Sequence, residues 1–128
     1  MSEPKQYIHR ELASGRSHTM TLADQVGNIG SEYERALRGK EKGDAKYFEG
    51  AMARLFELLD LTMADPRWSN HRVKKLSRMK EVICDELCNE VREHAHSRHL
   101  REYFLLVGIL ANKQRAAARK QQSAIGNE

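Results

Sequence analysis

Hydrophobic residues recur at steps of three and four along most of this chain, the spacing that gathers them on one face of an α-helix. The first such run predicts a helix from about residue 22 to about residue 40, capped by Thr19 or Thr21. Inside it, Gly27 and Gly30 each weaken the helix by about 0.5–1 kcal/mol relative to alanine. We interpret them as allowing another helix, rather than a ligand, to approach closely. The apolar face consists of Leu22, Val26, Ile29, Tyr33 and Leu37.

Two more helices follow, and a proline separates them. The second is predicted from Asp44, its cap, to about Ala64, with an apolar stripe wide enough for burial on more than one side. The dipeptide Asp65-Pro66 ends it, because the residue before a proline avoids helical geometry. The third helix is predicted from about residue 70 to residue 93. Its inner face consists of Val73, Leu76, Met79, Ile83, Cys84, Leu87, Cys88 and Val91.

The fourth helix, predicted from about residue 98 to residue 121, is more apolar than a single core requires. Between residues 103 and 111, the side chains of Leu105, Leu106 and Ile109 make it apolar nearly all round. Such a helix is either central in its fold or covered by another subunit. We therefore predict that Leu105, Leu106 and Ile109 form an oligomer or partner interface.

Four helices joined by short loops predict an all-α fold, an antiparallel up-down-up-down four-helix bundle over residues 19–121. Residues 1–18, polar and interrupted by Pro4 and Gly15, are expected to form a mobile N-terminal arm, and residues 122–128 a frayed C-terminal tail. The chain has 128 residues, the size of a single domain with one hydrophobic core.

The composition is typical of a soluble globular protein, with 40% hydrophobic and 31% charged residues. No apolar run reaches the roughly 18 residues that a membrane-spanning helix needs. The N-terminus lacks the apolar region of a secretory signal. We therefore expect a cytoplasmic protein without a membrane partner.

Cationic side chains are concentrated just after the second predicted helix. Six residues between Asp65 and Lys80 are cationic, and no acid follows Asp65 until Glu81. A helix N-terminus favours acids, so each base in its first turns opposes the helix dipole by about 0.3–1 kcal/mol. This placement of bases at the start of the helix suggests a bound anion rather than selection for stability. Because the net charge of the chain is only +4, the placement of the charges matters more than their sum.

The predicted topology brings the start of the third helix to the same end of the bundle as the end of the fourth, which forms one basic pole. We predict that this pole binds nucleic acid, either RNA or DNA, with Trp68 stacking on a base or a guanidinium. The alternative is a solvated charged face on which Trp68 closes the end of the core, and these two roles of Trp68 are compatible. The predicted nucleic-acid-binding residues are Arg67, Trp68, Arg72, Lys74, Lys75, Arg78, Lys113, Arg115 and Arg119.

Neither the histidines nor the cysteines predict a metal site, and no cofactor is expected. His94, His96 and His99 are spaced by two and three, whereas a pair of ligands on one helix needs four, so an exposed junction is favoured over a zinc, nickel or copper site. Cys84 and Cys88 have that spacing of four but lie among aliphatic residues, so we interpret them as small buried core residues. They are the only cysteines and share one predicted helix, which argues against a disulfide framework.

Motifs of known enzyme classes are missing from the sequence. It has no glycine-rich phosphate loop, nucleophile elbow or zinc-protease motif, so we expect no catalytic residues. One rival pattern is a loose match to HEPN-type ribonucleases, which carry an Arg or Asn followed shortly by a His. The pairs Asn89–His94 and Arg92–His99 fit that pattern, although they fall near the acidic end of the predicted bundle.

Two segments of the sequence resemble one protein family. They read LADQVGNIGSE, residues 22–32, and LLDLTMADPRW, residues 58–68. With them, about residues 20–105 resemble a family of small, all-helical, uncharacterised microbial proteins, and this resemblance implies the fold alone. In architecture, size and basic character the chain is also similar to the four-helix accessory proteins of diversity-generating retroelements, which assemble into rings and bind a reverse transcriptase and nucleic acid. That likeness carries over no residue roles.

The sequence therefore predicts a non-enzymatic accessory module and homo-oligomer. It is expected to bind nucleic acid, or a nucleoprotein partner such as a reverse transcriptase, through its basic pole. A first alternative is a protein–protein adaptor without nucleic-acid binding, whose partner covers Leu105, Leu106 and Ile109. A second alternative is a HEPN-like ribonuclease. Binding that weakens with salt separates the first two readings.

Overall fold

The computed structural model describes residues 7–69, 71–88 and 95–126, and for residues 95–98 and 124–126 it describes the backbone alone. Within these ranges the chain is helical and has no strand, which confirms the all-α prediction. Four long helices are accompanied by one short helix and two 3-10 turns. The elements are α1 (Arg10–Ala13), η1 (Arg16–Thr19), α2 (Leu22–Lys42), α3 (Ala45–Met63), η2 (Pro66–Trp68), α4 (His71–Cys88) and α5 (Ala95–Gly126).

Side-chain caps and one glycine define the ends of α2 and α3. The side chain of Thr21 accepts a hydrogen bond from the backbone N–H of Asp24, and that of Asp44 accepts one from Tyr47 at the start of α3. Between the two helices, Gly43 has a φ of 69°, a left-handed conformation that costs glycine little. Thr21 was one of the two predicted caps of the first helix, and the prediction of Asp44 as a cap is confirmed.

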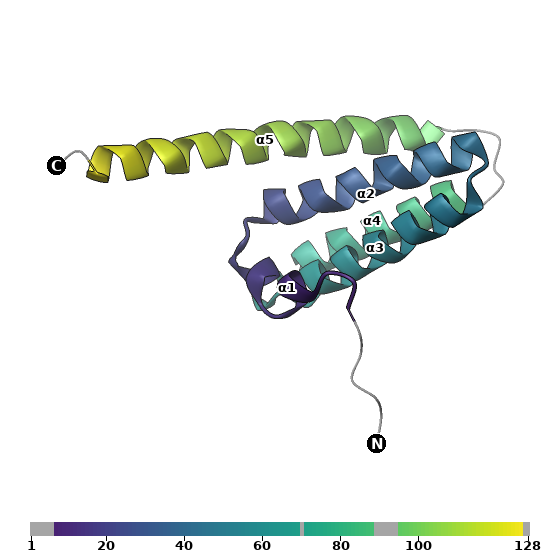
Figure 1. The fold of residues 1–128 in the computed structure, drawn as a ribbon, viewed down its shortest axis with the longest axis horizontal. Helices are drawn as coiled ribbons and strands as arrows, with labels where there is room; N and C mark the ends of the chain where they lie inside the picture. Colours follow the sequence, from purple (N-terminus) through teal and green to yellow (C-terminus); the bar gives the residue numbers. More distant parts are fainter. Residues whose placement is uncertain (1–6, 70, 89–94, 127–128) are drawn as a thin grey trace, which may run out of the picture.

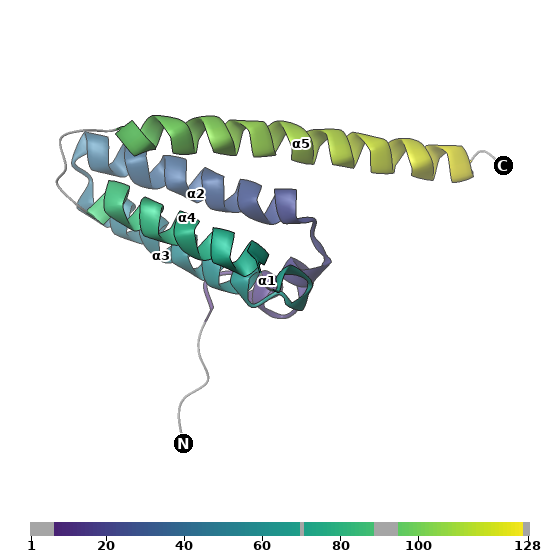
Figure 2. The same cartoon turned by 180° about the vertical axis from the view of Figure 1, so that it is seen from behind.

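The core is centred on α2, which contacts each of the other three long helices. Figures 1 and 2 show α5 along one side of α2, with α3 and α4 on the other side. The contact between α2 and α5 is close at Gly30, where an added Cβ would lie 2.7 Å from Cγ of Phe104. The prediction that Gly30 admits another helix is confirmed, whereas an added Cβ at Gly27 would meet nothing within 4 Å. The largest fully buried apolar side chains are those of Tyr33, Ile29, Leu55, Leu59 and Ile83.

Helix α5 runs past the rest of the fold. Its 32 residues span about 48 Å at 1.5 Å per residue, and Figure 1 shows its C-terminal half beyond the start of α2. In the half that lies on α2, Leu100, Phe104 and Ala111 are buried. From residue 112 to residue 123 every side chain is exposed. The helix continues to Gly126, through part of the segment expected to fray.

The N-terminal segment, assigned to a mobile arm on sequence grounds, forms α1 and η1 and bonds to α3. The backbone N–H groups of Ile8 and His9 donate to the carboxylate of Glu57 at 2.9 and 2.7 Å, and Nδ1 of His9 lies 3.1 Å from Oε1. Burial alone would raise the pKa of Glu57, but these hydrogen bonds lower it below its usual value. A carboxylate on α3 thus fixes a segment whose own sequence has little helix-forming pattern.

No helix in the described part of the chain is both long and apolar enough to span a membrane.

Candidate functional site

The turn between α3 and α4 is built on Asp65, whose side chain is completely buried. Its carboxylate accepts hydrogen bonds from the backbone N–H and the side chain of Arg67, with Nη2 of Arg67 2.7 Å from Oδ2. The hydrogen bonds from Arg67 lower the pKa of Asp65 from 3.8 to about 2, although burial opposes this shift. The same Nη2 donates to the carbonyl oxygen of Met20 at 2.6 Å. Arg67 is therefore held by the fold, and a phosphate would have to compete for it.

Gln25, on α2, connects this turn to η1. Its amide nitrogen donates to Oδ2 of Asp65 at 3.0 Å and to the carbonyl oxygen of Ser17 at 2.6 Å. Its amide oxygen accepts from Nε1 of Trp68 at 2.6 Å. Sequence reasoning missed this residue. The available signal was a polar residue next to Val26 on the inner face of a predicted helix.

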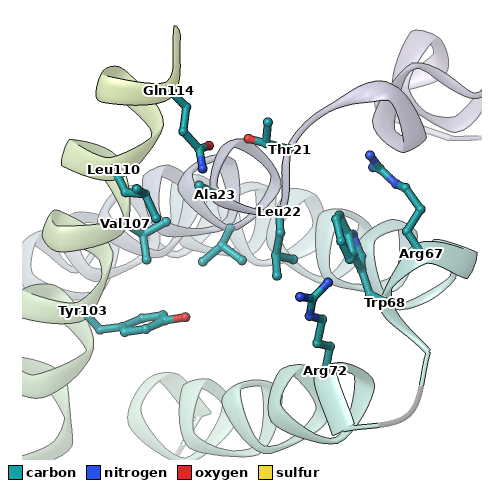
Figure 3. Close-up of a pocket in the computed structure, with 11 residues that line it drawn as sticks. Thr21, Leu22, Ala23, Arg67, Trp68, Arg72, Tyr103, Val107, Leu110 and Gln114 are labelled. Atoms are coloured by element: carbon teal, nitrogen blue, oxygen red, sulfur yellow. The ribbon is translucent and has the colours of Figure 1, made fainter. Parts of the chain in front are cut away.

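Trp68 is half-buried in the turn between α3 and α4, where its indole N–H donates to Gln25, and its role in closing the end of the core stays a prediction. The guanidinium carbons of Arg67 and Arg72 lie 4.5 and 5.2 Å from the centre of its ring. Figure 3 shows the two guanidinium groups on different sides of the indole. Cation–π attraction stabilises such an arrangement. A base could stack on this indole only after Arg72 moved away, so base stacking stays a prediction.

Helix α4 carries a group of exposed cations in its first half. Lys74, Lys75 and Arg78 are exposed, and none of them forms an ion pair within the described ranges. Lys80, further along the helix, is different: its Nζ lies 3.4 Å from Oδ1 of Asp60 and 5.7 Å from the centre of the Phe56 ring. We call Arg72, Lys74, Lys75 and Arg78 the α4 cationic row.

The predicted basic residues of the last helix divide into two kinds. Arg115 donates to Oδ1 of Asp24 at 2.9 Å and also hydrogen-bonds to Asn112, so it fastens α5 to the start of α2. Lys113 and Arg119 are exposed, and in the part of the chain that the structure describes neither has an acidic partner. The start of α4 and this part of α5 lie at the same end of α2, since Arg72 and Gln114 line one cavity.

That cavity has a volume of about 410 Å³ and lies between α2, η2, the start of α4 and α5 (Figure 3). Its walls are mainly apolar, and its cationic rim is formed by Arg67 and Arg72. Among the described residues, no Asp or Glu lines it. The apolar walls include Leu22, Val26, Val107 and Leu110.

The three residues predicted as an interface lie on an open face of α5. Leu105 and Leu106 are 66% and 65% exposed, and Ile109 is 46% exposed. Tyr103 and Leu110 extend the same apolar surface. The structure therefore leaves these side chains available to a partner, and the partner itself stays a prediction.

The prediction that both cysteines are buried is wrong for Cys88, which is exposed, while Cys84 is half-buried. Burial raises the pKa of the Cys84 thiol above its usual value. Helix α4 faces the core through Leu76, Ile83 and Leu87, and Cys88, the residue after Leu87, points away from that face.

The predicted histidine cluster and the ribonuclease-like pairs lie mostly outside the described residues. Asn89, Arg92 and His94 fall in the gap, the side chain of His96 is not described, and His99 is exposed. Within the ranges that the structure covers, no three His, Cys, Asp or Glu side chains are grouped so that they could hold a metal ion.

No protein-family model, curated protein or solved structure matches the chain. The residues themselves supply two features of different chemistry at one end of the molecule: the cations of α4 and α5, and an apolar cavity beside them.

Proposed function

We propose that this protein is a non-enzymatic accessory module that binds nucleic acid, RNA or DNA, or a nucleoprotein partner such as a reverse transcriptase. The binding surface consists of the α4 cationic row with Lys113 and Arg119 of α5. The observation that carries this proposal is the exposure of these side chains without an acidic partner in the described part of the chain.

Charge energetics support a polyanion as the ligand. Lys74 and Lys75 lie in the first turns of α4, where the helix dipole disfavours cations. Three acids on the neighbouring elements, Asp24, Asp60 and Asp65, are each bonded to another base. A phosphate backbone would neutralise the remaining cations and release its own condensed counterions, which favours association.

The roles of the nine predicted residues differ in this proposal. Arg67 and Arg115 hold the surface in shape through Asp65 and Asp24, and Trp68 is bonded to Gln25 beside them. The direct contacts fall to the exposed cations and are made mainly to phosphates, so sequence preference is expected to be weak.

A triple substitution tests this surface. Lys74→Ala, Lys75→Ala and Arg78→Ala together are expected to weaken binding to every nucleic-acid sequence at least tenfold at about 50 mM salt. They should also flatten the logarithmic salt dependence by about 0.7–0.9 for each phosphate that the variant no longer neutralises. Titrations of fluorescent single-stranded and duplex oligonucleotides at several salt concentrations measure both effects.

The matched control removes the same charge at the other end of α2 and α3. Arg38, Lys42 and Lys46 are exposed there, and their combined replacement by alanine is expected to leave most of the affinity and its salt slope in place. Equal losses in the two triple variants would mean that net charge alone drives binding. If the wild type binds neither RNA nor DNA at about 50 mM salt, alone or with a natural partner, the nucleic-acid proposal fails.

The open apolar face of α5 favours a second candidate function, protein docking or self-association. Two leucines that are about two-thirds exposed lie side by side on this helix, and their transfer out of water favours a partner.

We also infer that the four long helices form an antiparallel up-down-up-down bundle. The reversals of chain direction between successive long helices in Figures 1 and 2 support this arrangement, and a partner on α5 would cover its open side.

Light scattering at high micromolar concentration tests the second candidate. The wild type is expected to be an oligomer, and Leu106→Glu is expected to shift it to the monomer, because a carboxylate on this face would lose its hydration in the interface. Ala53→Glu, at an exposed position of α3, is the control and should leave the mass unchanged. If the wild type is a monomer, the α5 face does not mediate self-association, and its partner would have to be a different protein.

A further inference from the structure

Among the residues that the structure describes, the cavity between α2, η2, α4 and α5 combines an apolar interior with one cationic group, Arg72, that has no ion pair. We propose that it binds a small amphipathic organic anion, a medium-chain carboxylate, with the carboxylate on Arg72 and the hydrocarbon chain between α2 and α5. Its volume of about 410 Å³ lies within the range of about 300–1,000 Å³ that is usual for sites of small organic ligands. The proposal does not require nucleic-acid binding, although Arg72 belongs both to the cavity and to the α4 cationic row.

Arg72 is the group that would hold the anion. Arg67 also lies at the cavity, but its guanidinium is bonded to Asp65 and to the carbonyl oxygen of Met20. Arg72 has no ion pair within the described ranges and rests against the ring of Trp68. A guanidinium presents a fork of N–H donors that matches both oxygens of a carboxylate.

The charges around the cavity favour an anion over a cation or a neutral molecule. The lining of the cavity, as far as the structure describes the chain, contains no acid. Asp24 and Asp65, on the elements beside it, are bonded to Arg115 and Arg67. Figure 3 shows the hydroxyl group of Tyr103 pointing from α5 into the same space, so a second donor is available to the anionic end.

The opposite part of the cavity fits a hydrocarbon chain. Leu22 of α2 faces Val107 and Leu110 of α5 across it (Figure 3), and Val26 also lines it. Leu110 is half exposed, so apolar surface here is in contact with water. Each methylene group transferred from water to this surface strengthens binding about fourfold.

A flexible chain fits these walls better than a nucleobase does. A base needs an aromatic face to stack on and polar groups along its edge. The indole of Trp68 already has guanidinium groups on different sides, and the four aliphatic side chains offer no hydrogen-bonding groups. The cavity and the α4 cationic row therefore differ in the ligands they suit.

The single tryptophan of the chain lines the cavity, so its fluorescence reports on this site. Titration with octanoate is expected to change the emission of Trp68 saturably. Octan-1-ol, of equal chain length but uncharged, is expected to bind at least tenfold more weakly, because it cannot form the charge-assisted hydrogen bonds. Hexanoate, two methylenes shorter, is expected to bind roughly fifteenfold more weakly than octanoate. Isothermal titration calorimetry supplies the affinities independently of fluorescence.

Two variants distinguish binding at this site from general electrostatic attraction of the anion. Arg72→Gln is expected to lower the affinity for octanoate about tenfold and to leave that for octan-1-ol unchanged. Lys75→Gln, on the same helix but outside the cavity, should change neither. Absence of a saturable signal, equal binding of octanoate and octan-1-ol, or equal effects of the two variants would overturn the proposal. Occupation of the cavity by an unstructured oligonucleotide but not by octanoate, measured by the fluorescence of Trp68, would also overturn it.

Discussion

Replacing Asp65 with alanine is expected to lower the free energy of unfolding by about 3 kcal/mol. The buried carboxylate accepts hydrogen bonds from Arg67 and from Gln25, and it joins α2 to the turn before α4. Its removal leaves these donors with one acceptor fewer, in a place that water does not reach. Because the side chain of Arg67 is 39% exposed and can be partly hydrated, the loss should fall at the lower end of the range for broken buried pairs. Chemical denaturation followed by circular dichroism measures it.

Asp60 provides the control for this substitution. It also pairs with a base, Lys80, but the two side chains are 48% and 38% exposed. Asp60→Ala should therefore change the free energy of unfolding by about 0.5 kcal/mol or less. Similar losses in the two variants would show that burial of Asp65 contributes little to stability.

The acid dependence of stability provides a second readout of Asp65. Its pKa is about 2 in the folded protein and 3.8 in the unfolded chain, so its contribution is complete above about pH 4 and is lost as the pH falls toward 2. A displacement of nearly two pH units corresponds to about 2 kcal/mol. The difference in stability between the wild type and Asp65→Asn should shrink over this interval.

The second large effect is expected from Gly30→Val, which should destabilise the protein by about 3 kcal/mol and separate α5 from α2. A Cβ at this position would lie 2.7 Å from Cγ and 2.9 Å from Cβ of Phe104. Because Cβ of Phe104 is attached directly to the backbone of α5, rotation of the ring cannot relieve the clash, and overpacking of this kind costs about 1–3 kcal/mol. Separation of the helices adds the loss of apolar burial around Phe104.

The readouts are thermal unfolding and limited trypsin digestion, in which cleavage after Arg101 should become faster because this residue lies in the half of α5 that rests on α2. Gly27→Val on the same helix is the matched control. An added Cβ there has no neighbour within 4 Å, and valine favours a helix slightly more than glycine does, so stability should be unchanged or slightly higher. A Gly30→Val variant as stable as this control would refute the close approach of the two helices.

The parts of the fold that were predicted correctly depend on local sequence. Hydrophobic spacing located the long helices, and short-range capping preferences identified Thr21 and Asp44. Gly30 was recognised because a glycine inside a regular apolar face needs a packing reason.

The parts that were missed depend on contacts between distant residues. Gln25 meets Asp65 and Trp68, which are far away along the chain, and Glu57 meets His9 in a segment with little pattern of its own. No rule of local spacing specifies such partners. Cys88 was misplaced for a related reason: a spacing of four puts it on the same stripe as Cys84, but that stripe lies at the edge of the buried face.

The candidate site shows the same division. The sequence located the cations of α4, whereas the structure was needed to separate the arginines held by acids from those that are exposed. The cavity could not be foreseen, because its lining comes from four elements and depends on how α5 lies across α2.

The projecting half of α5 has a thermodynamic consequence of its own. Beyond Arg115, which is bonded to Asp24, the side chains of residues 116–123 gain nothing from a core, so helix and coil there differ little in free energy and interconvert without unfolding the body. A ligand that requires this segment to be helical must supply the ordering free energy, and its apparent affinity then falls as warming depopulates the helix. Arg119 and Lys120 would thus act as a temperature-dependent extension of the α4 cationic row, while the row itself stays fixed to the folded body.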